Sequence, residues 1–226
     1  MTTSKAREFP GHSKIRKAKK MRLNRKRILF ASVSVLALSL TVVLLHSFSL
    51  PPFKKKGVIH AEEICDSLGS APDATSSLEG VLPDRATYSF NDSTPDPRTD
   101  ETDISYLASC FVTGDGEQLL SVMTEMLEYD QADDWVQEAV GQFAPRASLE
   151  PFSAGDKAVA SSRVSAVYVP CSSHGENRHL SVVVRLKKNR EADPSELRKN
   201  LIALTKSAAS HAHQAAHCEV PSKVSS

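Results

Sequence analysis

Histidines gather close to the carboxyl end of the chain, where His211, His213 and His217 come directly before Cys218. Imidazole and thiolate groups are the usual protein ligands of zinc. If this stretch is helical, His213 and His217 lie on one face and could share a metal ion. Two histidines make an incomplete site, however, and Cys218 is better used in a disulfide. We therefore expect no metal and no cofactor: His211 is interpreted as a core histidine, and the other two as part of a solvated helix face.

Acidic side chains form the second unusual group. Between Arg98 and Arg146 the chain has no Lys or Arg, but it has these acids: Asp100, Glu101, Asp103, Asp115, Glu117, Glu125, Glu128, Asp130, Asp133, Asp134 and Glu138. We favour the interpretation that these residues form a solvated acidic face that keeps the domain soluble. The alternative is a docking surface for a basic envelope partner, which charge complementarity would attract. The spacing around Asp133 does not fit a calcium loop, which needs alternating ligands, a central glycine and a closing glutamate.

Catalytic signatures are absent from the sequence. It has neither the G-x-S-x-G motif of α/β-hydrolases nor the H-E-x-x-H motif of zinc proteases, and no S-x-x-K follows the apolar segment. A carboxylate pair for glycoside cleavage stays open, because acids are plentiful and their separations are not known from sequence. We therefore expect a non-catalytic binding or interaction module of unknown ligand. The alternative is a cell-envelope hydrolase or metal-binding protein that uses the His211–His217 cluster or an acidic pair.

An apolar segment over residues 28–50 decides where these groups lie in the cell. It holds 23 residues without a charged side chain, and as a helix it would be about 34 Å long, enough to cross a bilayer. Eleven Lys and Arg precede it, whereas only Lys54, Lys55 and Lys56 follow closely. The positive-inside rule therefore places the amino end in the cytoplasm. The length of the segment and the lack of a small-x-Ala site favour an uncleaved signal anchor over a cleaved signal peptide.

The resulting domain organisation has five parts. We expect a basic cytoplasmic tail over residues 1–27, a single transmembrane helix held in the lipid bilayer over 28–50, and a linker over 51–60. An extracytoplasmic domain over 61–219 and a disordered tail over 220–226 follow. No aromatic residue interleaves the bases between residues 14 and 27, so the basic tail is interpreted as a topology signal and not as a nucleic-acid site.

The part of the chain after the apolar segment is acidic and contains every cysteine. Residues 57–226 carry 14 Lys and Arg against 26 Asp and Glu, a net charge near −12, which argues against nucleic-acid binding. An even number of cysteines in an oxidising compartment predicts two disulfides. Three pairings of Cys65, Cys110, Cys171 and Cys218 exist. We favour Cys65–Cys110 with Cys171–Cys218, because each would tie a helix to a strand within one half of the domain.

The first half of the domain is predicted to run helix, strand, strand, helix, helix. The sequence indicates a short helix over 61–68, a turn of helix over 76–82, a strand over 85–91 and an exposed loop over 92–103. A strand over 104–112 places Ile104, Tyr106, Ala108 and Cys110 on one face. After the turn at Asp115-Gly116, apolar residues at helical spacing predict a helix: Leu119, Leu120, Met123, Met126 and Leu127. A further helix, opened by Asp133, would place Trp135, Ala139 and Phe143 on one face.

The second half is predicted to run strand, strand, helix. Strands over 157–169 and 178–188 flank a turn near Gly175, and Pro170-Cys171 is expected to stop the first of them. Asp193-Pro194-Ser195-Glu196 is a strong helix start, and that helix should run to about His217. Its apolar stripe would be Leu197, Leu201, Leu204, Ala208, His211, Ala215 and Cys218. Two hairpin-plus-helix units predict an α+β fold, a two-layer sandwich with an antiparallel sheet and helices on one face.

Two short motifs carry a resemblance to a known group. Val169-Pro170-Cys171 after a strand, and Ala215-Ala216-His217-Cys218-Glu219 at the end of the last helix, look like those of uncharacterised membrane-anchored or secreted proteins of streptomycetes, an actinobacterial group. The resemblance covers mainly residues 157–219. It implies an extracytoplasmic compartment and a similar fold. These motifs are disulfide and packing positions, so the resemblance implies no mechanism.

Overall fold

The computed structural model describes residues 36–44, 47, 56–94, 105–128, 131–172 and 178–225. The chain divides into two compact units, Met1–Lys55 and Lys56–Ser226. In the first unit residues 36–44 and 47 are helical. No helix within the described residues combines the length and the apolar character needed to cross a bilayer. Most of the expected transmembrane helix over 28–50 lies outside the described residues, so that helix stays a prediction.

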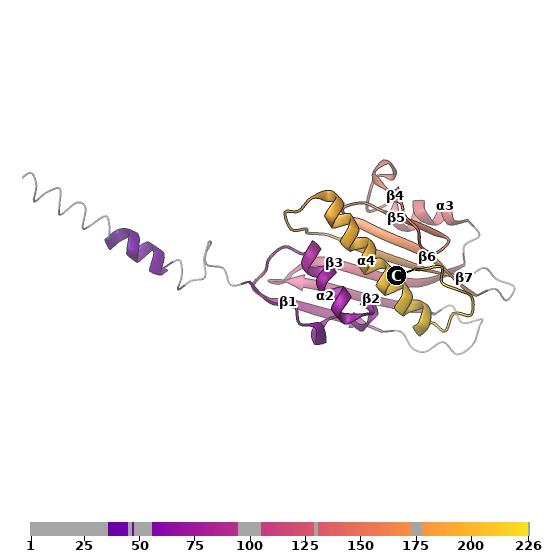
Figure 1. Ribbon diagram of the computed structural model, residues 1–226, viewed down its shortest axis with the longest axis horizontal. Coiled ribbons are helices and arrows are strands. Elements are labelled where there is room, and N and C mark those ends of the chain that lie inside the picture. Colours follow the sequence, from indigo (N-terminus) through magenta and orange to yellow (C-terminus); the bar gives the residue numbers. More distant parts are fainter. Residues whose placement is uncertain are drawn as a thin grey trace, which may run out of the picture. The chain divides into compact units, whose positions relative to one another are not determined.

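The second unit is built on one seven-stranded antiparallel sheet (Figure 1). Its strands are β1 (Tyr88–Ser93), β2 (Leu107–Gly114), β3 (Glu117–Glu128), β4 (Glu150–Pro151), β5 (Lys157–Ala160), β6 (Val164–Ser172) and β7 (Arg178–Leu186). Their order in space is β1-β2-β3-β7-β6-β5-β4, so the pairing of β3 with β7 joins the two halves of the domain. The expected α+β class with an antiparallel sheet is confirmed.

Two helices, α2 (Ala71–Val81) and α4 (Pro194–Ala215), cover one face of the sheet, and Figure 1 shows both in front of the strands. Alternate strand residues such as Val122, Val167 and Val182 point into the core beneath these helices. Two 3₁₀ turns, η1 (Ala61–Glu63) and η2 (Asp66–Leu68), border the same core, where we expected one short helix over 61–68. The helix predicted over 76–82 is longer than expected, since α2 begins at Ala71.

A third helix lies on the opposite face, which corrects the expectation that the helices cover one face only. This helix, α3 (Ala132–Trp135), continues into a π-helical turn, η3 (Val136–Val140). Trp135 is fully buried in a second core with Ala166, Tyr168 and Val183, which alternate along β6 and β7 with the residues that face α4. The indole Nε1 of Trp135 donates a 2.9 Å hydrogen bond to Ser181. The prediction of a helix near Asp133 that buries Trp135 is confirmed.

The helix predicted after Asp115-Gly116 is wrong, because this stretch is β3. Asp115 and Gly116 both have positive φ, 51° and 80°, which is the geometry of the two-residue hairpin turn that matches the twist of paired strands. The turn sends Glu117–Glu128 back along β2. Leu120 and Val122 then face the helices at strand alternation.

The strand predicted over 157–169 is in fact a hairpin of two strands, β5 and β6. Pro170 does not stop β6, which continues to Ser172. The reason lies in the register: the pairing of β5 with β6 reaches only to Tyr168, so Pro170 lies beyond the end of β5. Its missing N–H is therefore not needed by that neighbour.

Both disulfides have the favoured pairing. Cys65–Cys110 ties the η2 turn to β2, and Cys171–Cys218 ties β6 to the segment that follows α4. None of the four cysteines is free.

The carboxyl-terminal segment lies against the domain, in contrast to the disordered tail expected over 220–226. Glu219 N–H donates to the carbonyl of Cys171, and Gly155 N–H donates to the carbonyl of Lys223. The Lys223 ammonium also contacts Asp156 Oδ1 at 2.6 Å. These contacts are long-range, which is why local composition did not indicate them.

Candidate functional site

A groove of about 720 Å³ lies between α2 and α4, with Val224 and Ser225 of the carboxyl-terminal segment in its wall. Its volume falls in the range of small-molecule sites, about 300–1,000 Å³. The helix residues that line it are not those that face the sheet, so the groove opens on the outer side of the helix layer. We call it the α2–α4 groove.

Two glycines allow the helices that form the groove to approach closely. A Cβ atom on Gly80 would lie 2.7 Å from Cγ of Asn200, and one on Gly69 would lie 2.8 Å from the carbonyl oxygen of Ser207. Gly69 also has a φ of +80°, which a residue with a side chain rarely adopts. Because Gly69 lies opposite Ser207 and Gly80 opposite Asn200, the two helices run antiparallel.

Hydroxyl groups line much of this groove. Ser70, Ser76 and Ser77 come from α2 and its N-cap, and Ser207 and Ser210 come from α4. The Ser207 hydroxyl accepts a 3.2 Å hydrogen bond from the Ser70 N–H. Ser77 is 7% exposed, and its hydroxyl makes no hydrogen bond within the described part of the chain. The hydroxyl oxygen is not one of the buried polar atoms that lack a hydrogen-bond partner, so solvent in the groove reaches it and a molecule that enters the groove could bond to it.

Lysines bring positive charge to the groove in an otherwise acidic domain. Lys199 and Lys206 are seven residues apart on α4 and thus lie on one side of the helix. Lys206 Nζ donates a 2.7 Å hydrogen bond to the carbonyl of Ser225. Lys199 is exposed and forms no ion pair with any described residue. Asp73 is the single acid among the described lining residues, so the lining carries a net positive charge.

The predicted histidine cluster does not come together as a metal site. His211 is half-buried and lines the α2–α4 groove, so it is not the core residue that we expected. His213 Nε2 lies 2.8 Å from the carbonyl oxygen of Val220. His217 lies beyond the end of α4, with a φ of 49°. Among the described residues no group of three His, Cys, Asp or Glu side chains could hold a metal ion.

The end of α4 explains why His213 and His217 do not share a helix face. Cys218 N–H bonds to the carbonyl of His213, and His217 N–H bonds to that of Gln214. This pair of bonds is the Schellman motif, in which the residue after the C-cap adopts the left-handed conformation. The reversal turns Cys218 back toward Cys171. At the end of α4 the buried residues are Ala212 and Ala216 in place of His211 and Ala215, because at 3.6 residues per turn the stripe continues from Ala208 in steps of four.

Several of the acids that formed the predicted acidic face have basic partners from other elements. Glu117 pairs with both Arg85 and Lys188. Two more acids form ion pairs, Glu128 with Arg178 and Asp133 with Lys157. The Asp115 carboxylate instead accepts hydrogen bonds from the backbone N–H groups of Ala86 and Thr87. Asp100, Glu101, Asp103 and Asp130 lie outside the described residues. A docking surface for a basic partner therefore stays a prediction.

One polar cluster was not predicted from the sequence. Asp156 Oδ2 lies 2.9 Å from His179 Nε2, and Asp156 Oδ1 lies 2.6 Å from Lys223 Nζ. The His179 ring stacks on Tyr168 with ring centroids 4.0 Å apart, and Tyr168 stacks in turn on Trp135. Burial acts to raise the pKa of Asp156, but the hydrogen bonds from Lys223 and His179 and their charges outweigh it, so the pKa is lowered. The cluster fastens the carboxyl-terminal segment to β5 and β7.

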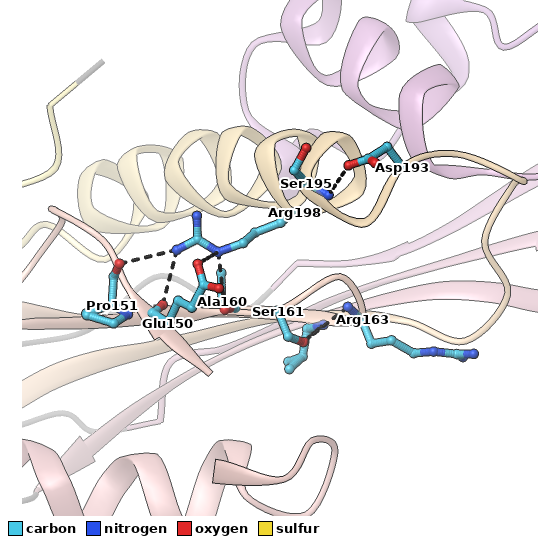
Figure 2. A network of polar contacts seen from close by, with 9 residues as sticks. Glu150, Pro151, Ala160, Ser161, Arg163, Asp193, Ser195 and Arg198 are labelled. Carbon is cyan, nitrogen blue, oxygen red and sulfur yellow. Dashed lines mark hydrogen bonds and ion pairs between the residues drawn. The ribbon is translucent and has the colours of Figure 1, made fainter. Parts of the chain in front are cut away.

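A second network positions α4, and with it one wall of the groove (Figure 2). The predicted cap is confirmed: the Asp193 carboxylate accepts a 2.8 Å hydrogen bond from Ser195 N–H. One turn further on, Arg198 donates to the carbonyls of Glu150, Pro151 and Ala160. Figure 2 shows this guanidinium reaching from α4 to β4 and β5. The first turn of α4 is thus fixed to the edge of the sheet.

No family model, no curated protein and no solved structure matches the chain.

Proposed function

We propose that the chain is a single-pass membrane protein whose folded domain lies outside the cytoplasm and binds a ligand in the α2–α4 groove without catalysing a reaction. The observation that carries the compartment is the pair of disulfides, Cys65–Cys110 and Cys171–Cys218. Disulfides persist in oxidising compartments, and all four cysteines follow the apolar segment over 28–50. Because that segment is preceded by the basic tail, the positive-inside rule gives the same orientation.

The groove supports binding as the role of this domain. It has the volume of a small-molecule site, and it presents hydroxyls and ammonium groups that are not fully used inside the protein. The sequence carries no motif of a known hydrolase, and for this reason we propose binding without chemistry. The metal-dependent alternative has no cluster of three candidate ligands among the described residues, and the hydrolase that uses an acidic pair stays the second candidate.

The orientation is tested by accessibility in intact cells. The full chain carries a different epitope tag at each end, and protease is added to cells or to spheroplasts. We expect loss of the carboxyl-terminal tag and protection of the amino-terminal tag until the membrane is lysed. In parallel, a thiol reagent is added to the denatured, unreduced protein, where we expect no reaction. Protection of the carboxyl-terminal tag, or four reactive thiols, would overturn the proposal.

A further inference from the structure

The α2–α4 groove contains a set of donors with unused capacity. The ammonium group of Lys199 has no carboxylate partner in the described part of the chain. Lys206 spends one of its three N–H donors on the Ser225 carbonyl, which leaves two for another acceptor. The two lysines are separated by two helical turns along one side of α4, so both can reach a ligand that lies along the groove.

Ser77 supplies an independent indication of a ligand. As a whole residue it is 7% exposed and lines the groove. Its hydroxyl has no protein partner within the described residues and is not among the fully buried polar atoms, so the accessible part of the side chain includes the hydroxyl. Serine is also a poorer helix former than alanine. A serine in place of a better helix former, with its hydroxyl open to the groove, is typical of a binding position.

The chemistry of the lining selects among ligand classes. An apolar ligand would remove the hydroxyls and ammonium groups from water without replacing their hydrogen bonds, which is costly. A carboxylate is matched best by the planar fork of arginine, whereas lysine serves phosphate as a point charge. Among the described lining residues there is no arginine, and there are two lysines and six serines. A tetrahedral phosphate can accept from several such donors at once.

The remaining lining fits the organic part of such a molecule. The groove, at about 720 Å³, is much larger than one phosphate group needs. Asp73 can accept hydrogen bonds from ligand hydroxyls, and the amide of Gln214 can both donate and accept. The negative charge of Asp73 near the two lysines would weaken the binding of an anion without hydroxyl groups. An anion that carries hydroxyl groups can instead donate hydrogen bonds to Asp73, so this type of ligand is favoured.

We propose that the α2–α4 groove binds a phosphate ester of a polyhydroxylated molecule, with Lys199 and Lys206 contacting the phosphate and Ser77 donating to one of its oxygens. This inference rests on the proposed binding function, since it names the ligand class of the same groove. It does not depend on the orientation of the chain in the membrane.

The test is calorimetric titration of the full chain, held in nanodiscs of zwitterionic phosphatidylcholine, with sn-glycerol 3-phosphate and with glycerol as the uncharged match. We expect binding of the phosphate ester only, weakening as salt is raised. Lys199→Met and Lys206→Met should each lower the affinity about tenfold, which is the usual worth of a charge-assisted hydrogen bond. Lys188→Met is the control, because Lys188 is an exposed lysine that pairs with Glu117 away from the groove. This variant should change the affinity for the phosphate ester by no more than about twofold.

Ser77→Ala is the decisive variant because it changes no charge. We expect it to lower the affinity about three- to tenfold while the thermal midpoint of the ligand-free protein stays the same or rises. A merely structural serine would give no loss of affinity, or a loss that goes with a lower midpoint.

Two results would overturn the inference. If the phosphate ester binds the three groove variants as tightly as the unaltered chain, the ion is held elsewhere, for example by the basic tail over residues 1–27. If nothing binds, or glycerol binds equally well, the ligand class is wrong. Neither result bears on the tag experiment, so a failed ligand class and a failed orientation are distinguishable.

The source of the phosphate ester is separated by changing the discs. In discs that contain phosphatidylglycerol, a lipid headgroup that occupies the groove would compete with soluble glycerol phosphate and weaken its apparent affinity. The matching Ser77→Ala chain should show a smaller effect, because its groove holds the headgroup less tightly. An unchanged affinity in these discs indicates a soluble ligand.

Discussion

His217 is a strained residue, and we predict that His217→Gly stabilises the protein. It occupies the left-handed position of the Schellman motif at the end of α4, with a φ of 49°. A residue with a Cβ atom in this conformation costs about 1–2 kcal/mol relative to glycine. Within the described residues the imidazole makes no hydrogen bond or ion pair that would offset this cost.

The size of the effect follows from two opposing terms. Relief of the backbone strain contributes about 1–2 kcal/mol. The greater freedom of glycine in the unfolded chain takes away about 0.4–1 kcal/mol. We therefore expect a net gain of about 0.5–1 kcal/mol in the free energy of unfolding, or roughly 1–4 °C in the midpoint of a domain of this size.

Asp115→Gly is the matched control, since Asp115 has nearly the same φ, 51°. Its carboxylate accepts hydrogen bonds from the N–H groups of Ala86 and Thr87 at 3.1 Å each. The free energy lost with these exposed but charge-assisted hydrogen bonds should exceed the free energy gained by relieving the backbone strain. This variant is therefore expected to be destabilised by about 1 kcal/mol. Urea unfolding followed by circular dichroism measures both. A destabilised His217→Gly protein, or the same sign of change in both variants, would refute the reasoning.

Three further predictions concern the Cys171–Cys218 disulfide, the Asp156 carboxylate and the single tryptophan. Replacing Cys171 and Cys218 by alanine should lower the free energy of unfolding by up to about 4 kcal/mol, from the chain-entropy cost of the loop they close, as measured by urea titration; an unchanged midpoint would show that the bond does not form. The pKa of Asp156 is lower in the folded chain than in the unfolded chain, so its stabilising effect is complete above its unfolded pKa and is lost as the pH falls through the folded one. Urea midpoints measured from about pH 6 down to pH 2 should therefore fall less steeply for Asp156→Asn, and parallel curves would contradict this. Trp135→Phe removes the donor that Ser181 accepts from inside the second core, and should cost about 1–3 kcal/mol by circular dichroism; a cost near zero would mean that Ser181 finds another partner.

The second half of the fold could be predicted because its signals are local. The cap at Asp193, the proline after it and the Leu197–Leu201–Leu204 spacing all act within one helix, and the structure places α4 as expected. The disulfide pairing was also correct, since each bond joins a helical segment or the end of one to a strand within one half of the domain.

The error at β3 shows where apolar spacing fails. Leu119, Leu120, Met123, Met126 and Leu127 fit a helical stripe, but Leu120 and Met126 also fit strand alternation through the intervening Val122 and Thr124. Both periods share these residues, so spacing alone could not choose between them. The Asp-Gly pair and the β-branched residues were the signals for a strand.

The candidate groove could not have been predicted, because it is made by a contact between distant segments. Ser77 and Lys199 are separated by more than a hundred residues and meet only when α2 and α4 pack against each other. The histidines attracted attention because they are rare and close in sequence. Ser77, the residue with the unused hydroxyl, is one serine among many, and nothing local distinguishes it.

The position of β3 in the middle of the sheet has a consequence for how the chain can be made. Its pairing partner β7 begins only at Arg178, so the hairpin of β2 and β3 is synthesised well before that partner exists. Until then one side of β3 presents unpaired N–H and C=O groups and uncovered apolar side chains, which is a template for another copy of the same chain. A nascent or truncated protein that stops before β7 should therefore aggregate, and arrival of the last hairpin and α4 is the event that seals the sheet.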